Sequence, residues 1–478
     1  MSAEDIRSLL PMVILAGGIL LTLIVVAIKR NHELAFVTTA LILLAAIVAA
    51  LLHLDEKPHA IGAIIIIDRI GLYYQILLLS ATLAISIFSY ISIHRLFPDK
   101  RKEEYYLLLM LATLGSCMMV VSTHFISFFV SIEILTISLY TLISYYREQA
   151  KAIEAGLKYL VLAAMSSAFL LFGMALIFAA SGEMSFSGLS AITAAMSGSA
   201  TMMLVVGTGL MIVGIGFKLA LVPFHMWAPD VYEGASSPVS AFIATVSKGG
   251  VVAFLLHFFM MADLYRYPKV MLAFMVIAVL SMLMGNLLAL MQNNVKRMLA
   301  YSSIAHLGYL LVAFIAGKGM GVQAATFYIT VYVITIIGAF GIITVISPSD
   351  SEATDLEAYK GLFWRRPFLA ALFTIFLLSL AGIPLTAGFI GKYFLLTAGL
   401  GSAQWMLAFV LVASSVIGLF YYLRVIVAMM KQEEDNLSAS KSPLAASIGG
   451  IIALSLLALL IIGLGVYPGW LIEMVKSL

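Results

Sequence analysis

The chain has 478 residues, of which 63% are hydrophobic and 11% are charged, and its mean hydropathy is +1.10. A soluble domain is about 45–50% apolar and about 25% charged, so this composition excludes a soluble protein and indicates a polytopic membrane protein. The single cysteine, Cys117, excludes an intrachain disulfide, a cysteine-rich zinc site and an iron–sulfur cluster. The net charge of +3 says little, because the basic residues are spread among loops, and the sequence contains no P-loop and no other nucleotide or nucleic-acid motif.

Long apolar runs predict the membrane-spanning helices. A helix needs about 20 apolar residues to cross the hydrocarbon core, and this rule predicts an all-α polytopic fold with about 14 transmembrane helices. They are expected at residues 6–28, 34–54, 70–93, 105–121, 124–145, 153–180, 200–228, 238–262, 268–290, 297–316, 321–346, 367–399, 404–428 and 444–466. The segments 200–228 and 367–399 are too long for one straight helix, and each contains a proline.

Glu133 lies near the middle of the fifth predicted span, in FISFFVSIEILTISLYTLIS (125–144), with no compensating charge nearby in the sequence. A charge at the bilayer centre costs about 2.5–3.5 kcal/mol on the insertion scale, so its presence predicts a function. Lys158 follows nearer to the cytoplasmic end of the next span. A structural ion pair, or a side chain that reaches the surface along its aliphatic stem, is the simpler alternative for Lys158.

The stretch GFKLALVPFH (216–225) places a charge beside a helix breaker. Pro223 cannot donate to an upstream carbonyl, so the helix is expected to break between Leu219 and Val222. Irregular backbone at membrane depth is tolerated only where it is buried in protein or lines a wet cavity. Lys218 is therefore predicted to lie beside a hydrated break in the helix, where water reaches its amine. His225, which follows the break, is a candidate proton carrier through water.

Lys248, Lys392 and His306, the last in YSSIAHLGY (301–309), fall inside later predicted spans. One glutamate cannot neutralise three deep lysines, so the lysines must be neutral part of the time or be reached by water. Buried lysines near a carboxylate, with access to water, are typical of a proton relay. A lone membrane histidine is more often a packing residue, which is the alternative for His306 and for His225.

The two proline-containing spans also indicate an internal repeat. LALVP (219–223) resembles LAGIP (380–384), and SLYTLIS (138–144) can be laid on LGYLLVA (307–313). The offsets lie near roughly 165 residues, and the unit of five helices is odd, which predicts two inverted repeats with a broken helix in each. The expected division is 1–104 (three N-terminal helices), 105–262 (first repeat), 263–430 (second repeat) and 431–478 (C-terminal helix).

Basic residues predict the orientation, because cytoplasmic loops carry an excess of Lys and Arg. The smaller set of alternate loops, with both termini, holds Arg7, Lys57, Arg69, Arg266, Lys269, Lys318 and Lys476. Both termini are therefore expected on the non-cytoplasmic side. The opposite loops hold more than twice as many basic residues, namely Lys29, Arg30, Arg95, Lys100, Arg101, Lys102, Arg147, Lys151, Lys296, Arg297, Lys360, Arg365, Arg366, Arg424, Lys431 and Lys441.

Three segments carry a family resemblance: PFHMWAPDVYEGASSPVSAFIATVSKGG (223–250), NNVKRMLAYSSIAHLGYLL (293–311) and YKGLFWRRP (359–367). They resemble the antiporter-like subunits of proton-pumping NADH:quinone oxidoreductase, respiratory complex I. DVYEG (230–234) and GLFWRRP (361–367) are most similar to its N type, subunit N. The PFHxWxPD pattern also resembles subunits of multisubunit cation/proton antiporters and membrane-bound hydrogenases.

The resemblance implies a role for each embedded charge. Glu133 is similar to the family's fifth-span glutamate, and Lys218 to the seventh-span lysine that pairs with it. Lys158 is similar to a sixth-span lysine that modulates the pair. Lys248 resembles the connecting lysine of the eighth span, and Lys392 the twelfth-span lysine nearest the exit side.

The resemblance also implies a function. The chain is expected to translocate protons across the bacterial inner (plasma) membrane, driven by electron transfer from NADH to quinone elsewhere in the complex. NADH, FMN, iron–sulfur clusters and quinone are expected on partner membrane and peripheral subunits, and no cofactor or metal on this chain. The alternatives are a sodium-for-proton antiporter subunit, a membrane-bound hydrogenase subunit, and a passive spacer, which the cost of the deep lysines disfavours.

Overall fold

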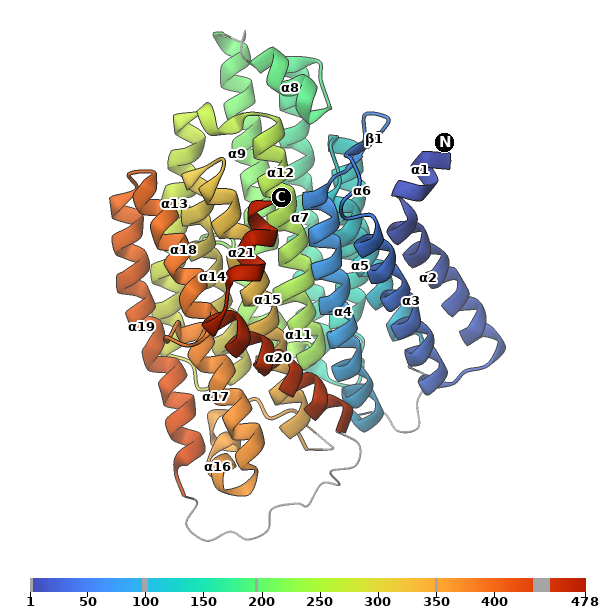
Figure 1. The fold of residues 1–478 in the computed structure, drawn as a ribbon, viewed down its shortest axis with the longest axis vertical. Helices are drawn as coiled ribbons and strands as arrows, with labels where there is room; N and C mark the ends of the chain where they lie inside the picture. The colour runs from blue at the N-terminus through green and yellow to red at the C-terminus, as the bar shows by residue number, and fades with distance from the viewer. Residues whose placement is uncertain (1–2, 97–101, 194–196, 349–350, 433–447) are drawn as a thin grey trace.

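The computed structural model is a bundle of helices that describes residues 3–96, 102–193, 197–348, 351–432 and 448–478 (Figure 1). Lys100, Arg101 and Lys441, which contribute to the predicted orientation, lie outside the described residues. Both chain ends lie in the upper part of Figure 1, and α16 (Leu362–Arg365) lies at the opposite end of the bundle.

The first half of the bundle begins with α1 and a short hairpin and ends with the segment that carries Lys248. In chain order its elements are α1 (Ala3–Ser8), α2 (Leu10–Ile28), α3 (His32–Leu52), β1 (His59–Ile61), β2 (Ile65–Ile67), α4 (Arg69–Leu96), α5 (Glu104–Val120), α6 (Phe125–Ile143), α7 (Ala150–Ser181), α8 (Phe186–Thr193), α9 (Ser199–Leu219), α10 (Trp227–Gly234), α11 (Ser237–Phe242), the π-helical turn η1 (Ile243–Ser247) and α12 (Lys248–Met261).

The second half contains the other broken helix. Its elements are η2 (Leu264–Arg266), α13 (Pro268–Leu290), α14 (Val295–Ala316), α15 (Met320–Ile346), η3 (Leu356–Tyr359), α16, α17 (Pro367–Ala381), α18 (Ala387–Gly401), α19 (Trp405–Met430), α20 (Ile448–Val466) and α21 (Gly469–Lys476).

Twelve helices in the described ranges are long and apolar enough to cross a membrane, counting Ser237–Met261 as one. The two remaining predicted spans correspond to the shorter helix α5 and to α17 followed by α18. The helical membrane fold is confirmed, and the count of 14 spans stays a prediction. The antiparallel hairpin β1–β2 was not predicted; Gly62, at φ +59°, makes its reversal possible.

Closely packed helix pairs support the predicted repeat. A Cβ added to Gly115 of α5 would lie 2.7 Å from the backbone nitrogen of Leu135 in α6. A Cβ added to Gly285 of α13 would lie 2.6 Å from the backbone nitrogen of Ala305 in α14. Both pairs of helices thus approach at a position where only glycine fits, and the two contacts are related by one constant offset in numbering.

The loops at the start of α6 and α14 repeat the same pattern. Each helix begins after a residue whose side chain caps it, and the next loop along the chain bridges to that residue. The bridges are His124–Ser185 and Asn294–Asp355, with backbone hydrogen bonds from Phe125 to Met184 and from Val295 to Thr354. The two bridges are separated in numbering by the same offset as Gly115 and Gly285, which supports a structural unit that occurs twice in the chain.

Both broken helices end in the same kind of cap. Ala220 and Gly382 follow α9 and α17 in the left-handed conformation, at φ +56° and +82°. The N–H of each bonds to the carbonyls three and four residues earlier. The interruptions predicted between Leu219 and Val222 and before Pro384 are therefore confirmed.

Gly388→Ala should be strongly destabilising, because its Cβ would lie 1.8 Å from the carbonyl oxygen of Ser379 across the second break. We expect a loss of about 2–3 kcal/mol, at the upper end for an overpacked site. The control is Gly401→Ala in the same helix, where nothing lies within 4 Å. Melting temperatures of the solubilised proteins test this, and a Gly388→Ala variant as stable as the control would contradict the close packing.

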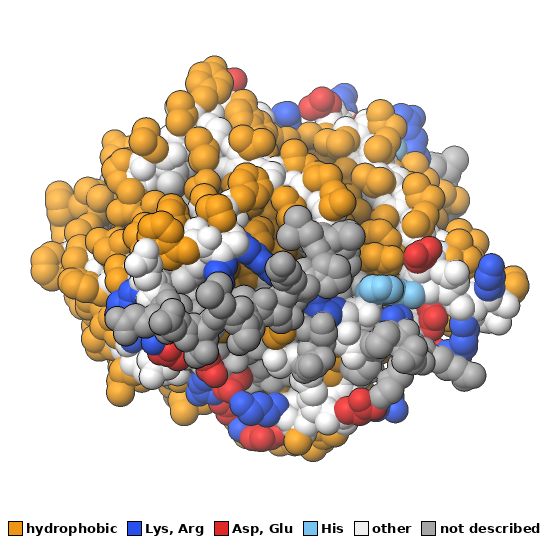
Figure 2. All heavy atoms as spheres, turned by 90° about the horizontal axis from the view of Figure 1, so that it is seen from below, with side chains coloured by type: hydrophobic (Ala, Val, Ile, Leu, Met, Phe, Trp, Pro, Cys, Tyr) orange, Lys and Arg blue, Asp and Glu red, His pale blue; other side chains and the backbone are white. Residues whose placement is uncertain are grey.

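Charged side chains are spread over the end of the bundle that holds α16, and hydrophobic side chains cover much of its periphery (Figure 2). An apolar periphery between charged ends is the arrangement expected of a protein that crosses a bilayer.

A candidate proton path along buried lysines

The first helix break is buried in protein. Beyond Leu219 the chain turns through Ala220, and helix resumes at Trp227. The indole N–H of Trp227 donates to the carbonyl oxygen of Phe217 at 2.9 Å, so a side chain occupies one carbonyl next to the break. Pro223 contributes no N–H to the turn, as its position in the sequence predicts.

Lys218 lies in the last turn of α9 and is only 3% exposed. Its Nζ donates to Thr136 Oγ1 at 2.5 Å and to the hydroxyl of Tyr159 at 3.4 Å. The Nζ atom also lies 5.3 Å from the centre of the Tyr159 ring, and the face of an aromatic ring stabilises the charged form of a lysine. The amine therefore points toward α6 and α7.

Glu133 lies on the same face of α6, one helical turn before Thr136. Its Oε1 accepts a hydrogen bond from Ser167 Oγ of α7 at 2.5 Å. Within the described ranges no ion pair within 4.0 Å joins Glu133 to Lys218. The direct pair implied by the resemblance is thus not formed in this conformation. Glu133 instead accepts a hydrogen bond from the hydroxyl of Ser167, and Lys218 donates one to the hydroxyl of Thr136.

Lys248 begins α12 directly after the π-helical turn Ile243–Ser247, and it is fully buried. Its Nζ donates to Ser303 Oγ of α14 at 2.7 Å, and the hydroxyl of Tyr332 donates to the same oxygen at 2.7 Å. π-turns are rare and often mark functional positions. Sequence patterns gave no sign of this turn.

His306 lies in the same helix as Ser303 and is buried between two tyrosines. Its Nδ1 is 2.6 Å from the hydroxyl of Tyr328, and its Nε2 is 3.1 Å from that of Tyr422. The hydroxyl of Tyr422 also contacts Ser302. These hydroxyls continue the polar interior beyond Lys248, and sequence reasoning missed all of them.

Lys392 lies in α18, after the second break, and is 9% exposed. Its Nζ donates to the carbonyl oxygen of Ala381 at 2.8 Å and to Ser415 Oγ at 2.7 Å. Ala381 is the last residue of α17, so the amine occupies a carbonyl that the break exposes. Lys392 and Lys218 thus each lie at a helix break, as the sequence predicts.

His225 lies in the turn between α9 and α10 and is 6% exposed. Neither of its ring nitrogens meets the geometry of a hydrogen bond among the residues that the structure describes, although the backbone of Pro223 lies near the ring. A buried imidazole without a protein partner is a place where water fits. This environment is compatible with the predicted proton carrier.

Lys158 lies apart from the buried lysines, with 42% of its side chain exposed. It forms ion pairs with Glu154 and Asp230, both at 2.7 Å. Asp230 also accepts from Arg297, so α7, α10 and α14 meet in one charged cluster. The cluster lines a cavity of about 220 Å³. It matches the alternative of a structural ion pair at the surface.

The basic partners of the carboxylates in this cluster lower the pKa values of Asp230 and Glu233. Burial acts to raise the pKa of Asp230 and Glu233, but hydrogen bonds from Lys158, Arg297 and Lys151 outweigh it, so both pKa values lie below their ordinary values. A carboxylate with a lowered pKa stabilises the fold above the ordinary pKa of about 4, and this contribution is lost as the pH falls through the lowered pKa.

Asp230→Ala should therefore lower stability by on the order of 1 kcal/mol near neutral pH, because the ion pairs are partly exposed. The difference from wild type should shrink as the pH falls below about 4 and disappear only below the lowered pKa of Asp230, where the aspartate is protonated in the folded protein as well. Melting temperatures across pH test this, with Glu357→Ala as the control, since Glu357 pairs only with Lys360 one turn away in the described chain. A difference that persists in acid would contradict the ionic origin.

The prediction that Lys296 lies in a loop before the span 297–316 is wrong, while the side of the membrane on which it lies stays a prediction. Helix α14 begins at Val295, and Lys296 is fully buried in its first turn. Its Nζ donates to Glu352 Oε2 at 2.5 Å. A lysine next to a helix start has the same sequence signature whether it faces water or protein, so its burial was not predictable from the pattern.

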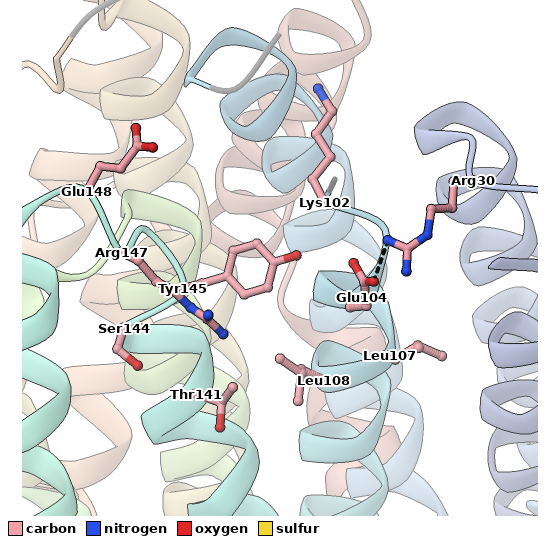
Figure 3. Close-up of a pocket in the computed structure, with 10 residues that line it drawn as sticks. All are labelled: Arg30, Lys102, Glu104, Leu107, Leu108, Thr141, Ser144, Tyr145, Arg147 and Glu148. Carbon is pink, nitrogen blue, oxygen red and sulfur yellow. Dashed lines mark hydrogen bonds and ion pairs between the residues drawn. The ribbon is translucent and has the colours of Figure 1, made fainter. Parts of the chain in front are cut away.

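A cavity of about 710 Å³ lies away from these lysines (Figure 3). Charged side chains line one end, where Arg30 donates to Glu104 at 2.8 Å, and Leu107, Leu108 and Thr141 line the other. It contains none of the predicted relay residues. In the described chain no three His, Cys, Asp or Glu side chains are placed to hold a metal ion.

Known proteins share both the sequence and the fold. Residues 122–418 match the family described as NADH:quinone oxidoreductase/Mrp antiporter, transmembrane region. NADH-quinone oxidoreductase subunit N of Ectopseudomonas mendocina is 43% identical, over 100% of this chain and 97% of the relative. Subunit N of Chromohalobacter salexigens is 40% identical, over 99% and 98%.

Among solved structures, a chain of respiratory complex I from Thermus thermophilus with bound aureothin is 31% identical. It superposes with a TM-score of 0.83, over 97% of this chain and 98% of that chain. The resemblance found in the sequence is thus confirmed: the chain belongs to the NADH:quinone oxidoreductase/Mrp antiporter family, in the group of NADH-quinone oxidoreductase subunit N.

Proposed function

We propose that this chain translocates protons across the membrane through a relay of Glu133, Lys218, Lys248 and Lys392. The observation that carries the proposal is the environment of the three lysines. Each is at least nine-tenths buried, and within the described ranges none has a carboxylate within 4.0 Å. A permanently charged ammonium in such a place is costly, so these amines are suited to exchanging protons.

The relay begins with a change of partner at the first break. Lys218 leaves Thr136 and pairs with Glu133 when the carboxylate leaves Ser167. At 4 Å and an effective dielectric of 20, two unit charges attract by about 4 kcal/mol, which is enough to change the proton affinity of the lysine by orders of magnitude. Forming or breaking the pair therefore loads or releases the proton on Lys218.

The proton then moves along the hydroxyl-lined interior. Lys248 receives it, with Ser303 as its hydrogen-bond partner, and His306 and its tyrosines lie next along α14. Lys392 releases it on the exit side. His225, without a protein partner at the break, carries protons through water. Lys158 acts from the surface, by holding Asp230 beside the first break.

The driving reaction takes place on other subunits. Electron transfer from NADH through FMN and iron–sulfur clusters to quinone requires groups for which this chain has no ligands in its sequence, which contains a single cysteine. The chain supplies the path for protons, and its partners are the membrane and peripheral subunits of NADH-quinone oxidoreductase, as in its relatives' names.

The chain is placed in a bacterial inner membrane with both termini on the non-cytoplasmic side. The excess of Lys and Arg in one set of alternate loops over the other set supports this orientation. A reporter fused after Leu478 should then behave as non-cytoplasmic, and one inserted between Arg95 and Lys102 as cytoplasmic. Reversed readouts would overturn the orientation.

The function is tested by reconstituting the complete complex into vesicles and measuring NADH oxidation together with proton uptake. Variants at Lys218, Lys248 and Lys392 should lose proton uptake while the complex remains assembled. The family description also includes Mrp antiporters, so sodium flux is measured in the same vesicles. Proton uptake that requires opposing sodium flux would favour a sodium-for-proton exchanger instead.

A further inference from the structure

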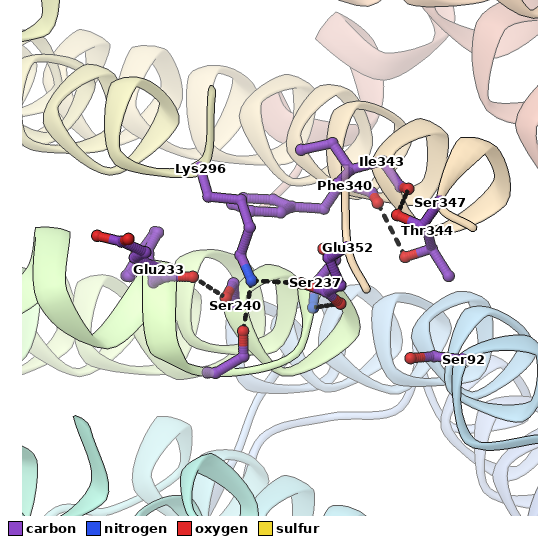
Figure 4. A network of polar contacts seen from close by, with 12 residues as sticks. Ser92, Glu233, Ser237, Ser240, Lys296, Phe340, Ile343, Thr344, Ser347 and Glu352 are labelled. Atoms are coloured by element: carbon purple, nitrogen blue, oxygen red, sulfur yellow. Dashed lines mark hydrogen bonds and ion pairs between the residues drawn. The ribbon is translucent and has the colours of Figure 1, made fainter. Parts of the chain in front are cut away.

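A buried Lys–Glu pair joins the first turn of α14 to the loop between α15 and α16, toward the end of the bundle that holds α16 (Figures 1 and 4). Lys296 Nζ donates to Glu352 Oε2 and to the carbonyl oxygen of Ala235, both at 2.5 Å. Glu352 Oε1 accepts the backbone N–H of Ser237 at 2.8 Å. Glu352 therefore joins its loop to α14 and to the first turn of α11, the start of the segment that carries Lys248.

The pair is buried on one side and reaches the surface on the other. The side chain of Lys296 is 1% exposed, and that of Glu352 is 14% exposed. A small cavity of about 10 Å³, close to the space that one water needs, touches Glu352 together with Arg95 and Ser351. The carboxylate is therefore the member of the pair that can exchange protons with water.

Buried hydroxyls without a well-formed hydrogen bond lie between this pair and Lys248. Ser236, Ser237 and Tyr232 are each at least nine-tenths buried, and their hydroxyl oxygens do not meet the geometry of a hydrogen bond in the described chain, although Ser236 faces the phenol of Tyr146. Two of them adjoin the N–H that Glu352 accepts. Buried hydroxyls without a protein partner are places for ordered water.

Tyr232 connects these hydroxyls to the relay. Lys248 Nζ lies 5.8 Å from the centre of the Tyr232 ring. The Tyr232 hydroxyl also faces Ser303, the hydrogen-bond partner of Lys248, without meeting the geometry of a bond to it. Polar groups therefore extend from the surface at Glu352 to the centre of the lysine row, along a route separate from the break at Pro223.

We propose that Glu352 takes up protons at this end of the bundle and delivers them to Lys248 through water held by Ser236, Ser237 and Tyr232. The proposal rests on the proposed function of the relay. It adds an entry that does not pass through Glu133 and Lys218.

The proton is accounted for at each step. The Glu352 carboxylate accepts a proton from surface water and forms an O–H, which removes its charge from Lys296. The neutral acid then donates its proton to the first interior water, and the carboxylate pairs with the ammonium of Lys296 again. Water and the Tyr232 hydroxyl each accept one proton and donate one, the neutral amine of Lys248 becomes an ammonium, and Glu352 is a carboxylate again.

The groups that face Glu352 come from several elements. Lys296 of α14 and Arg95 of α4 are cationic, and the phenols of Tyr105, Tyr146 and Tyr359 interact with the carboxylate electrostatically.

Tyr232→Phe is the principal test, because it removes one unpartnered hydroxyl and keeps the ring that packs against Phe340. Lys296→Met combined with Glu352→Gln removes both charges together and avoids leaving one buried charge alone. The controls are Tyr265→Phe, which also removes an unpartnered hydroxyl, and Glu357→Gln, which removes an exposed acid near the same loop.

The measurement is proton uptake by inside-out vesicles that contain the complete complex, with the outside pH varied. Both test variants should lower uptake at least about threefold at alkaline pH and much less at acidic pH, where protons are abundant. A structural defect would lower uptake equally at every pH, and that result would overturn the proposal. Normal uptake in both test variants, with uptake lost in Lys248→Met, would also overturn it and leave the relay intact. Normal uptake in Lys248→Met would overturn the proposed function itself.

Discussion

Lys218→Ala in the assembled complex is expected to lower proton uptake at least about tenfold, and quinone-coupled NADH oxidation with it, because the two are coupled. The variant removes the titratable group at the first break, and tenfold in rate is about 1.4 kcal/mol in the barrier. Lys218→Arg should not restore uptake, since arginine keeps its proton at physiological pH. Proton uptake and NADH oxidation are measured together in vesicles.

Glu133→Ala should give a similar loss, because the lysine then has no carboxylate to pair with during the cycle. Glu133→Asp should be milder, provided that water bridges the shorter side chain. Lys269→Ala, at an exposed position, is the matched control. Normal pumping in both alanine variants of a fully assembled complex would mean that the Glu133–Lys218 pair takes no part in the proton path.

The breaks were predictable because proline acts locally. Pro223 and Pro384 cannot donate a backbone hydrogen bond, so the interruption of α9 and α17 followed from single residues. The left-handed Ala220 was not predictable in the same way. An alanine gives no sign of that conformation, which here depends on the cap that follows α9.

The embedded lysines were identifiable because a charge in an apolar run is rare, but their partners were not. Lys218 contacts Thr136 of another helix, and Lys248 contacts Ser303 of another. Serine and threonine are common in membrane helices, so only the packing of the bundle shows which of them face a lysine. The absence of a direct Glu133–Lys218 ion pair has the same cause, since Ser167 comes from a third helix.

Boundary residues were harder to place than those deep in a span. Lys296 lies at the start of α14, where a shift of one turn decides between water and protein, and its partner Glu352 comes from a distant loop. The π-turn before Lys248 was also invisible, because IATVS reads as ordinary helix or strand.

Lys248→Met is expected to raise stability and abolish function at the same time. Lys248 is fully buried with Ser303 as its hydrogen-bond partner, so methionine of similar length removes a buried amine and retains most of the packing. We expect a gain on the order of 1 kcal/mol and a fall in proton uptake of at least about tenfold. Functional groups are commonly retained at such a cost in stability.

The control is Leu255→Met in the same helix, a buried and volume-conserving change that should cost less than about 1.5 kcal/mol and leave uptake normal. Melting temperature and proton uptake are measured on the same preparations. Loss of stability together with loss of uptake in Lys248→Met would indicate that the lysine supports the structure. Higher stability with normal uptake would show that the proton path avoids Lys248. Only opposite changes in the two quantities fit a buried amine whose role is to bind and release a proton.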